Sequence, residues 1–191
     1  MSKKSNHRKS SASHASTPDA NEQPAVELSP EMKALIGRLQ DSVVERAVKA
    51  IEELTATNSP AAVLPLIEVV QNPDHVFHSV TRATAAMALG KLGCNEAVAT
   101  LTAATQDSSF AVSSEAILAL GELRAKPAIG MLMTIVQNAN GFYSEITRFA
   151  ALRALGRIGD AAARQILAET AGRTTESAAI ATAACEALTN L

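Results

Sequence analysis

The chain has 191 residues, 47% of them hydrophobic but only 3% aromatic, and a formal net charge of −2. Residues 29–191 carry 13 basic and 16 acidic side chains, which disfavours a nucleic-acid binder, because such binding depends on many Lys and Arg contacts to phosphates. No apolar run approaches the roughly 18 residues that a membrane span requires, so we expect a soluble protein without a membrane span. Ala and Leu are common among the apolar residues, which favours helices over strands.

Residues 1–28 are predicted to be a disordered, Ser-rich and basic tail. They hold almost no large apolar side chain and cannot bury enough surface to offset the entropy lost on ordering. Four basic residues and no acid lie within residues 1–18, so the alternative is an arm attracted weakly to anionic lipid or nucleic acid. Ser29-Pro30-Glu31 then supplies a helix cap, a first-turn proline and a first-turn acid. We expect order to begin at residue 29.

A short segment containing Ala-Leu-Gly recurs along the rest of the chain. It reads ATAAMALGKLG at 83–93, SEAILALGELR at 114–124 and FAALRALGRIG at 149–159. Fainter copies are RAVKAIEEL at 46–54 and ATAACEALTNL at 181–191. Repetition at a period of 30 to 40 residues, on the order of that in known repeat arrays, indicates a stack of similar structural units.

A second helical pattern follows each of the first four copies, with apolar residues at three- and four-residue steps. These patterns occupy residues 60–72, 96–107, 127–138 and 162–172. One helix pair cannot bury its apolar face alone, so neighbouring pairs must stack. We therefore predict an all-α solenoid of stacked antiparallel helix pairs over residues 29–191, with an N-terminal cap helix, about four pairs and a C-terminal helix. Leu188 and Leu191 leave that last helix apolar, which would allow an oligomer through it.

The tetrapeptide Gly90-Lys91-Leu92-Gly93 has two interpretations. A glycine pair around a lysine can clamp a phosphate backbone, as in KH domains, or it can end a helix. The tetrapeptide recurs with Glu122 at the lysine position and Arg157 at the next copy. Because a phosphate site would not readily accept glutamate, the helix-turn interpretation is favoured.

These units resemble HEAT-like repeats, in particular the short bacterial kind called phycobilisome-lyase HEAT-like repeats. In that pattern a basic residue stands near the start of the first helix, here Arg82 and Arg148, six residues before the alanine of the triplet. Ser113, Val44 and Ala181 stand there in the other copies, so a ladder of arginines would be broken. The resemblance implies a superhelical array and, for function, most often a scaffold.

We expect no catalytic residue, cofactor or metal site. Asp74, His75 and His78 have a spacing that could begin a metal site, but a convincing site would need a further ligand and a fixed second shell. Cys94 and Cys185 lie 91 positions apart, so we expect free structural thiols and a cytoplasmic protein.

Aromatic residues mark one predicted edge of the array. Phe77, Phe110 and Phe142 each lie in a turn that leads from one helix pair to the next, and Tyr143 follows Phe142. Each ring could pack at a helix start and join adjacent repeats, which is the simpler interpretation. The alternative is an exposed ridge for a partner, best developed at Asn140-Gly141-Phe142-Tyr143, where the loop is longest in this region.

The third triplet lies in the most basic repeat. Arg153 and Arg157 are four residues apart and share a helix face, and Arg148 lies nearby. A solvated outer face explains them, and a docking patch for an acidic partner is the alternative. Our candidate partner-binding residues are therefore Phe142, Tyr143, Arg148, Arg153 and Arg157.

For function we expect a non-enzymatic scaffold or adaptor that binds an unidentified protein partner, with the second helix of each pair lining a concave surface. The resemblance supplies an alternative, a bilin lyase-like or phycobilisome-associated subunit that handles a tetrapyrrole. DNA binding by a HEAT-like array is the third, and the acidic balance disfavours it.

Overall fold

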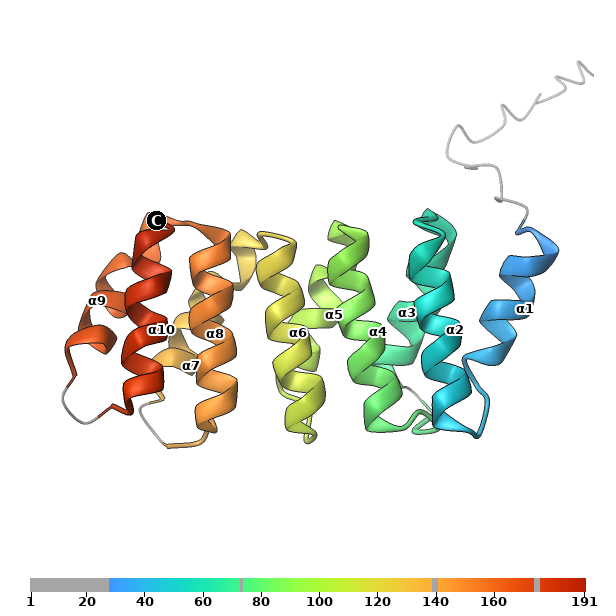
Figure 1. The fold of residues 1–191 in the computed structure, drawn as a ribbon, viewed down its shortest axis with the longest axis horizontal. Coiled ribbons are helices and arrows are strands. Elements are labelled where there is room, and N and C mark those ends of the chain that lie inside the picture. Colours follow the sequence, from blue (N-terminus) through green and yellow to red (C-terminus); the bar gives the residue numbers. More distant parts are fainter. Residues whose placement is uncertain (1–27, 73, 139–140, 174–175) are drawn as a thin grey trace, which may run out of the picture.

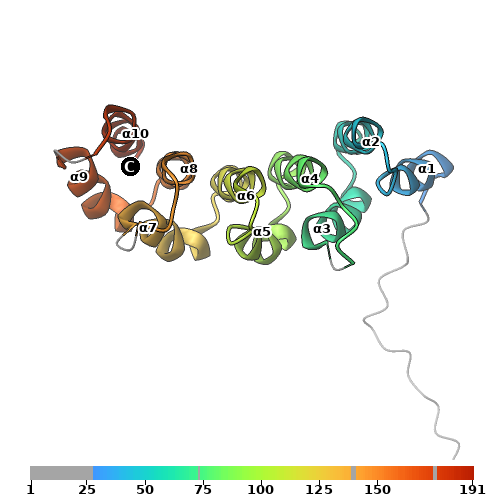
Figure 2. The same cartoon turned by 90° about the horizontal axis from the view of Figure 1, so that it is seen from below.

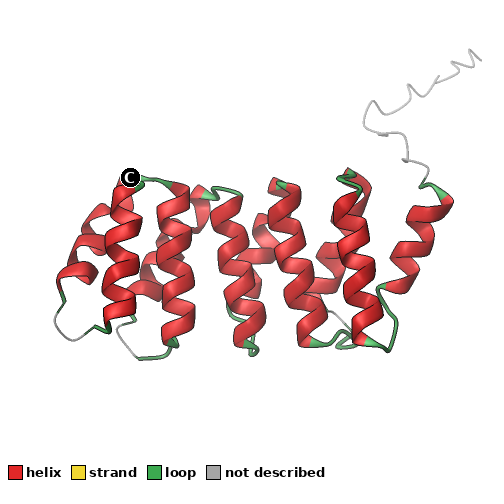
Figure 3. Ribbon diagram, viewed as in Figure 1, coloured by secondary structure: helices red, strands yellow, loops and turns green. Residues whose placement is uncertain are grey.

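The computed structural model describes residues 28–72, 74–138, 141–173 and 176–191. Within these residues the chain is helical with no strand (Figure 3). The tail predicted for residues 1–28 lies outside the described residues, apart from Leu28.

Helices in the described residues follow one another as antiparallel pairs in a row (Figure 1). The all-α solenoid predicted from the repeats is confirmed. Each even-numbered helix from α2 to α8 is the first of its pair, and a single 3₁₀ turn precedes the second helix of every pair. The helices are α1 (Pro30–Arg38), α2 (Val44–Ala56), α3 (Val63–Gln71), α4 (Ser79–Leu92), α5 (Val98–Ala104), α6 (Phe110–Glu122), α7 (Ile129–Gln137), α8 (Glu145–Ile158), α9 (Arg164–Gly172) and α10 (Ala178–Thr189).

Local sequence sets several of the helix ends. Ser29 Oγ accepts a hydrogen bond from Met32 N at 3.2 Å and Pro30 begins α1, as the Ser-Pro-Glu sequence predicts. Gly93 and Gly159 end α4 and α8 with φ of 71° and 69°, the left-handed conformation that glycine adopts at least cost. The second glycine of the repeated tetrapeptide therefore terminates a helix.

The helices form two layers around a continuous apolar core (Figure 2). The first helices α2, α4, α6 and α8 lie with α10 in one layer, and the second helices α3, α5, α7 and α9 lie in the other. The row curves toward the layer of first helices, so these helices line the concave side (Figure 2). Our expectation that the second helices line the concave surface is wrong.

Close approach between successive first helices accounts for this curvature. A Cβ added at Gly90 would lie 2.8 Å from Ala119 Cα, closer than real Cβ contacts come. The same holds between Gly121 and Ala154 Cα, at 2.7 Å. First helices can therefore pack backbone to backbone, whereas α3 and α5 touch much less extensively than α4 and α6. The more closely packed layer lies on the inside of the curve.

Candidate functional site

The first helices all begin at the same edge of the array, the lower edge in Figure 1, and we call it the N-terminal edge. It comprises the helix starts of α2, α4, α6, α8 and α10 with the loops that precede them. It contains all four aromatic residues that the sequence predicted to share one edge. The candidate site is built on this edge and on the adjoining concave face.

Two of the aromatic residues hold the loops in place. Phe77 N donates to Asn72 Oδ1 and Tyr143 N donates to Asn138 Oδ1, both at 2.8 Å. Asn72 and Asn138 end α3 and α7 in the left-handed conformation, so the two loops are built alike. Phe77 and Tyr143 pack against the core. The packing interpretation holds for these two rings.

The other two aromatic residues on this edge face solvent. Phe110 is 65% exposed and Phe142 is 77% exposed. Phe142 contacts Tyr143 edge to face, with ring centroids 5.1 Å apart. For Phe110 and Phe142 the packing interpretation is wrong, and the exposed ridge describes them better.

Aliphatic side chains that sequence reasoning missed extend this exposed surface. Val76 lies at the position equivalent to Phe142 and is 65% exposed, and Ile146 on α8 is 61% exposed. Phe149, one turn further along α8, is also exposed. We define the apolar edge as these exposed residues together: Val43, Val76, Val80, Phe110, Phe142, Ile146 and Phe149. Exposed apolar side chains gathered on one surface mark an interaction site more often than scattered ones do.

Arg148 has a different role from the one we predicted. Its guanidinium donates to both carboxylate oxygens of Glu176, at 2.6 and 2.7 Å, and to Val136 O at 3.0 and 3.2 Å. Its side chain is only 11% exposed. Arg148 joins α8 to the loop before α10 and is committed to intramolecular contacts. We therefore leave it out of the candidate partner surface.

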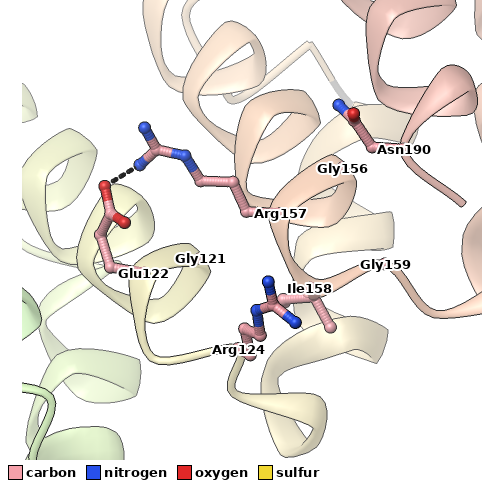
Figure 4. A pocket seen from close by; sticks show the side chains of 8 residues that line it. All are labelled: Gly121, Glu122, Arg124, Gly156, Arg157, Ile158, Gly159 and Asn190. Carbon is pink, nitrogen blue, oxygen red and sulfur yellow. Dashed lines mark hydrogen bonds and ion pairs between the residues drawn. The ribbon is translucent and has the colours of Figure 1, made fainter.

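Arg153 and Arg157 lie exposed on α8, as their spacing predicts. Arg157 forms an ion pair with Glu122 of α6 (Figure 4). Beside this pair, at the edge opposite the N-terminal edge, is an open hollow of about 460 Å³ that also holds Arg124 and Asn190 (Figure 4). Helices α6 and α8 end there, so carbonyl groups with negative partial charge face it. The positive charges of Arg124 and Arg157 are balanced by Glu122 and by these carbonyl groups. The hollow therefore has little excess positive charge with which to bind an anion.

The remaining candidates show no reactive arrangement. His78 Nδ1 accepts a hydrogen bond from Val80 N at 3.3 Å and so caps α4, while Asp74 and His75 are exposed. No group of three or more His, Cys, Asp or Glu residues in the described ranges is arranged to hold a metal ion. Burial and the neighbouring Glu96 raise the pKa of the Cys94 thiol, which lowers its thiolate fraction. Among the described helices, none has the length and hydropathy needed to cross a membrane.

Comparison with known proteins identifies the type of repeat. A family model described as HEAT repeats matches residues 75–143, and one described as PBS lyase HEAT-like repeat matches residues 147–171. A comparison with curated proteins gave no match. A similar solved structure is the complex of CpcE and CpcF of phycocyanin lyase from Nostoc sp. PCC7120, at 25% sequence identity and a TM-score of 0.69. The match covers 92% of this chain and 70% of that one.

Proposed function

Because the chain is a HEAT-like repeat protein that carries a repeat of the phycobilisome-lyase type, we propose that it is a subunit of a bilin lyase-type assembly. In this proposal it binds a partner protein through the apolar edge and the concave face, and the assembly handles a tetrapyrrole. We also propose that it works in the cytoplasm, in keeping with the wide spacing of its two cysteines.

One observation carries the proposal: nearly the whole chain matches a chain of a lyase complex in structure. The match covers 92% of this chain and leaves little of it without a counterpart. The HEAT-like repeat alone would indicate a scaffold of any kind. A match of this extent to a phycocyanin lyase structure favours the lyase-type role over an unrelated scaffold.

The apolar edge supports the partner-binding part. Phe142 and Phe110 expose most of their surface, and aromatic residues that bury large areas on binding contribute strongly to protein interfaces. Ile146 and Phe149 continue the exposed surface along α8, one of the first helices that line the concave side. The hollows lined by Arg157 and by Phe142 are open to solvent, which suits a protein partner better than a small molecule enclosed by this chain alone.

A titration with phycocyanobilin tests the tetrapyrrole part. The purified protein, alone and mixed with host extract, is titrated with the bilin while the visible spectrum is recorded. We expect a saturable change in the absorption band and co-elution of bilin with protein in size-exclusion chromatography. An unchanged spectrum under both conditions would contradict a lyase-type role.

A matched pair of variants tests the surface. Phe142→Ser removes an exposed ring from the apolar edge, and Leu64→Ser removes a side chain of similar exposure, 74%, from α3 in the other layer. We expect Phe142→Ser to weaken capture of the partner by about tenfold or more, as loss of an interface anchor does, and Leu64→Ser to leave it unchanged. Equal capture by both variants would place the partner elsewhere.

The second candidate function is an adaptor without bilin chemistry. The same apolar edge favours it, because binding to a protein partner would by itself account for the exposed apolar side chains. A flat bilin spectrum together with partner capture that depends on Phe142 would select it.

A further inference from the structure

Four positions in the array, one on each of α2, α4, α6 and α8, are equivalent to one another, but only two of them hold arginine. Each lies six residues before the alanine of its triplet copy, at the start of a first helix. Arginine stands there in α4 and α8, as Arg82 and Arg148, while Val44 in α2 and Ser113 in α6 replace it. The junctions between successive first helices therefore alternate between arginine-containing and arginine-free.

Where the arginine is present, it fills the junction. Arg82 forms an ion pair with Asp107, and both side chains are only 14% exposed. Arg148 pairs with Glu176, and both are 11% exposed. In each case the acid lies in the loop before the next first helix, so the ion pair joins two repeats.

Where the arginine is absent, a hollow opens at the N-terminal edge. The hollow at Ser113 has a volume of about 220 Å³ and is lined by Asp107, Phe110, Phe142 and Tyr143, among others. The hollow at Val44 has a volume of about 370 Å³ and contains two acids. Neither hollow has a Lys or Arg among its described lining residues.

We propose that the hollow at Ser113 receives an arginine side chain from the partner protein, which takes the place that the chain's own arginine fills in the neighbouring junctions. The proposal rests on the proposed function only in that a protein binds the apolar edge, since Phe110 and Phe142 form the rim of this hollow. It specifies the chemistry of one anchor on that partner. The hollow at Val44, with Asp41 and Asp74, offers a second position of the same kind.

Charge and hydrogen-bonding groups favour a guanidinium over an apolar anchor. Asp107 supplies a carboxylate whose Oδ2 already pairs with Arg82 and whose Oδ1 accepts a hydrogen bond from Ser109 N, so an incoming guanidinium would share it. Glu176 shows that such sharing occurs in this fold, since it contacts Arg173 at 3.6 Å as well as Arg148. Ser144 and Thr147 add hydroxyl oxygens that can accept hydrogen bonds from a planar donor.

The rings of Phe142 and Tyr143 add an aromatic surface to this polar lining. They lie at 90° to each other, and both rings belong to residues that line the hollow. A guanidinium is attracted to an aromatic face within about 6 Å of the centroid. Arginine combines the charge, the planar donors and the apolar stem that this lining suits.

Nuclear magnetic resonance with a small probe tests the proposal on the whole protein. N-acetyl-arginine amide is titrated into isotope-labelled protein, with N-acetyl-citrulline amide and N-acetyl-norleucine amide as the neutral polar and apolar comparisons. We expect saturable shifts at Asp107, Phe142 and Tyr143 with the arginine probe and affinities at least about tenfold weaker for the other two. Equal shifts with norleucine would show an apolar anchor and overturn the proposal, as would no shift with arginine.

Two variants locate the binding. Ser113→Arg supplies the missing side chain from within, as in the neighbouring junctions, and should abolish the arginine-probe shifts while the melting temperature stays at or above that of wild type. Because Ser113 is buried, a second variant is needed that does not disturb the core, and Phe142→Ser serves, with an expected loss of about tenfold in probe affinity. Binding that survives both changes would overturn the proposal.

The probe experiment and the bilin titration fail independently. Probe binding at Ser113 together with a flat bilin spectrum would leave the hollow's chemistry standing and reject the lyase-type role. A bilin response together with no arginine-probe shift would reject the hollow's chemistry alone.

Discussion

At Gly90, the missing side chain determines how closely α4 and α6 can approach. The position that a Cβ would occupy is 2.8 Å from Ala119 Cα and 2.9 Å from Ala119 Cβ, both within α6. The neighbour is backbone, which cannot move aside as a flexible side chain could. The glycine of the repeated triplet is thus required for packing, and the sequence predicted a small residue at this place.

Gly90→Ala and Gly130→Ala make the same chemical change with opposite expected results. At Gly90 the added methyl forces two helices apart, so the free energy of unfolding should fall by about 1–3 kcal/mol. Gly130 lies in α7 with nothing within 4 Å of the added Cβ, so alanine should raise the free energy of unfolding by about 0.5–1 kcal/mol. Urea denaturation measures both, and a neutral Gly90→Ala would contradict the close packing.

Glu176 makes stability depend on acid pH. Hydrogen bonds from Arg148 hold the pKa of the Glu176 carboxyl below its ordinary value, despite burial, which acts to raise it. A lowered folded-state pKa stabilises the protein above the unfolded pKa of about 4.3, and this stabilisation is lost as pH falls through the lower folded value.

Glu176→Gln tests this contribution. Wild type should lose part of its free energy of unfolding as pH falls below about 5, and Glu176→Gln should lose less, because its side chain does not titrate. The difference between the two proteins should therefore be largest near neutral pH. Denaturant titrations at several pH values measure it, and parallel curves for the two proteins would show that Glu176 is not coupled to Arg148.

Arg148 also shows what single residues in a sequence do not reveal. From the sequence, Arg148 is a charged residue near the start of a helix. These two properties are consistent with a solvated, a partner-binding or a buried side chain. Its acceptor Glu176 is 28 residues away in the next loop, and that pairing follows only from stacking of the repeats. Exposure of Phe142 is hidden for the same reason, since its neighbour Tyr143 is the one that reaches the core.

At the scale of elements, helix starts differ in how well they are capped. Ser144 and Ser177 cap α8 and α10 with their hydroxyl oxygens, whereas Val43, the residue before α2, has no side-chain acceptor. Val43 has the extended backbone that capping residues adopt, with φ of −89° and ψ of 109°. A serine at position 43 could therefore cap α2 without a change in the backbone.

Val43→Ser should raise the free energy of unfolding by about 0.5–1 kcal/mol, since its hydroxyl can accept a backbone N–H of the first turn. Thermal unfolding measures the gain, and the reverse change at a working cap, Ser144→Ala, should lower stability by a similar amount. No gain from Val43→Ser would show that Asp41 Oδ1, which accepts from Val43 N at 2.8 Å, already fixes this helix start.

Periodicity predicted the helices well and their outer faces poorly. Three- and four-residue steps identify an apolar stripe, and the pairs of helices follow from it. Ile146 and Phe149 belong to such steps in α8, so their pattern is also consistent with burial. Whether a helix has one apolar face or two depends on how many neighbours cover it, and that is a property of the array.

The 3₁₀ turn before α3 is not caused by the proline that follows it. Pro65 lies in the first turn of α3, but the same 3₁₀ turn occurs before α5, α7 and α9, which have no proline at the equivalent position. The turn is therefore a property of the repeat and not of this one residue.

At the scale of the whole molecule, curvature decides which surface a partner meets. It depends on small differences in spacing between layers, summed over four junctions. The repeated Ala-Leu-Gly shows that first helices pack closely, but it does not show how far apart the second helices lie. For that reason the sequence predicts the order of the helices correctly but predicts the wrong layer for the concave side.

The junction between α6 and α8 is held differently from its neighbours. It has the Gly121–Ala154 contact but Ser113 in place of the buried arginine, and its ion pair between Glu122 and Arg157 is exposed by 39% or more on both sides. Exposed ion pairs contribute little, about 0–1 kcal/mol. In an array where each repeat contacts only its neighbours, a junction without a buried ion pair is a place where two parts of the array can separate.

Gly121→Val should therefore divide the array. Its Cβ would lie 2.7 Å from Ala154 Cα, and weakening this junction should let α8 to α10 unfold at lower denaturant than α2 to α6. Hydrogen exchange read by mass spectrometry should then show protection lost first in residues 145–191, whereas wild type and Gly130→Ala lose it in both halves together. If Gly121→Val instead lowers stability while all helices still unfold in one step, the junctions are coupled more strongly than this chain's own contacts indicate, and the α6–α8 junction is not the point where the array separates.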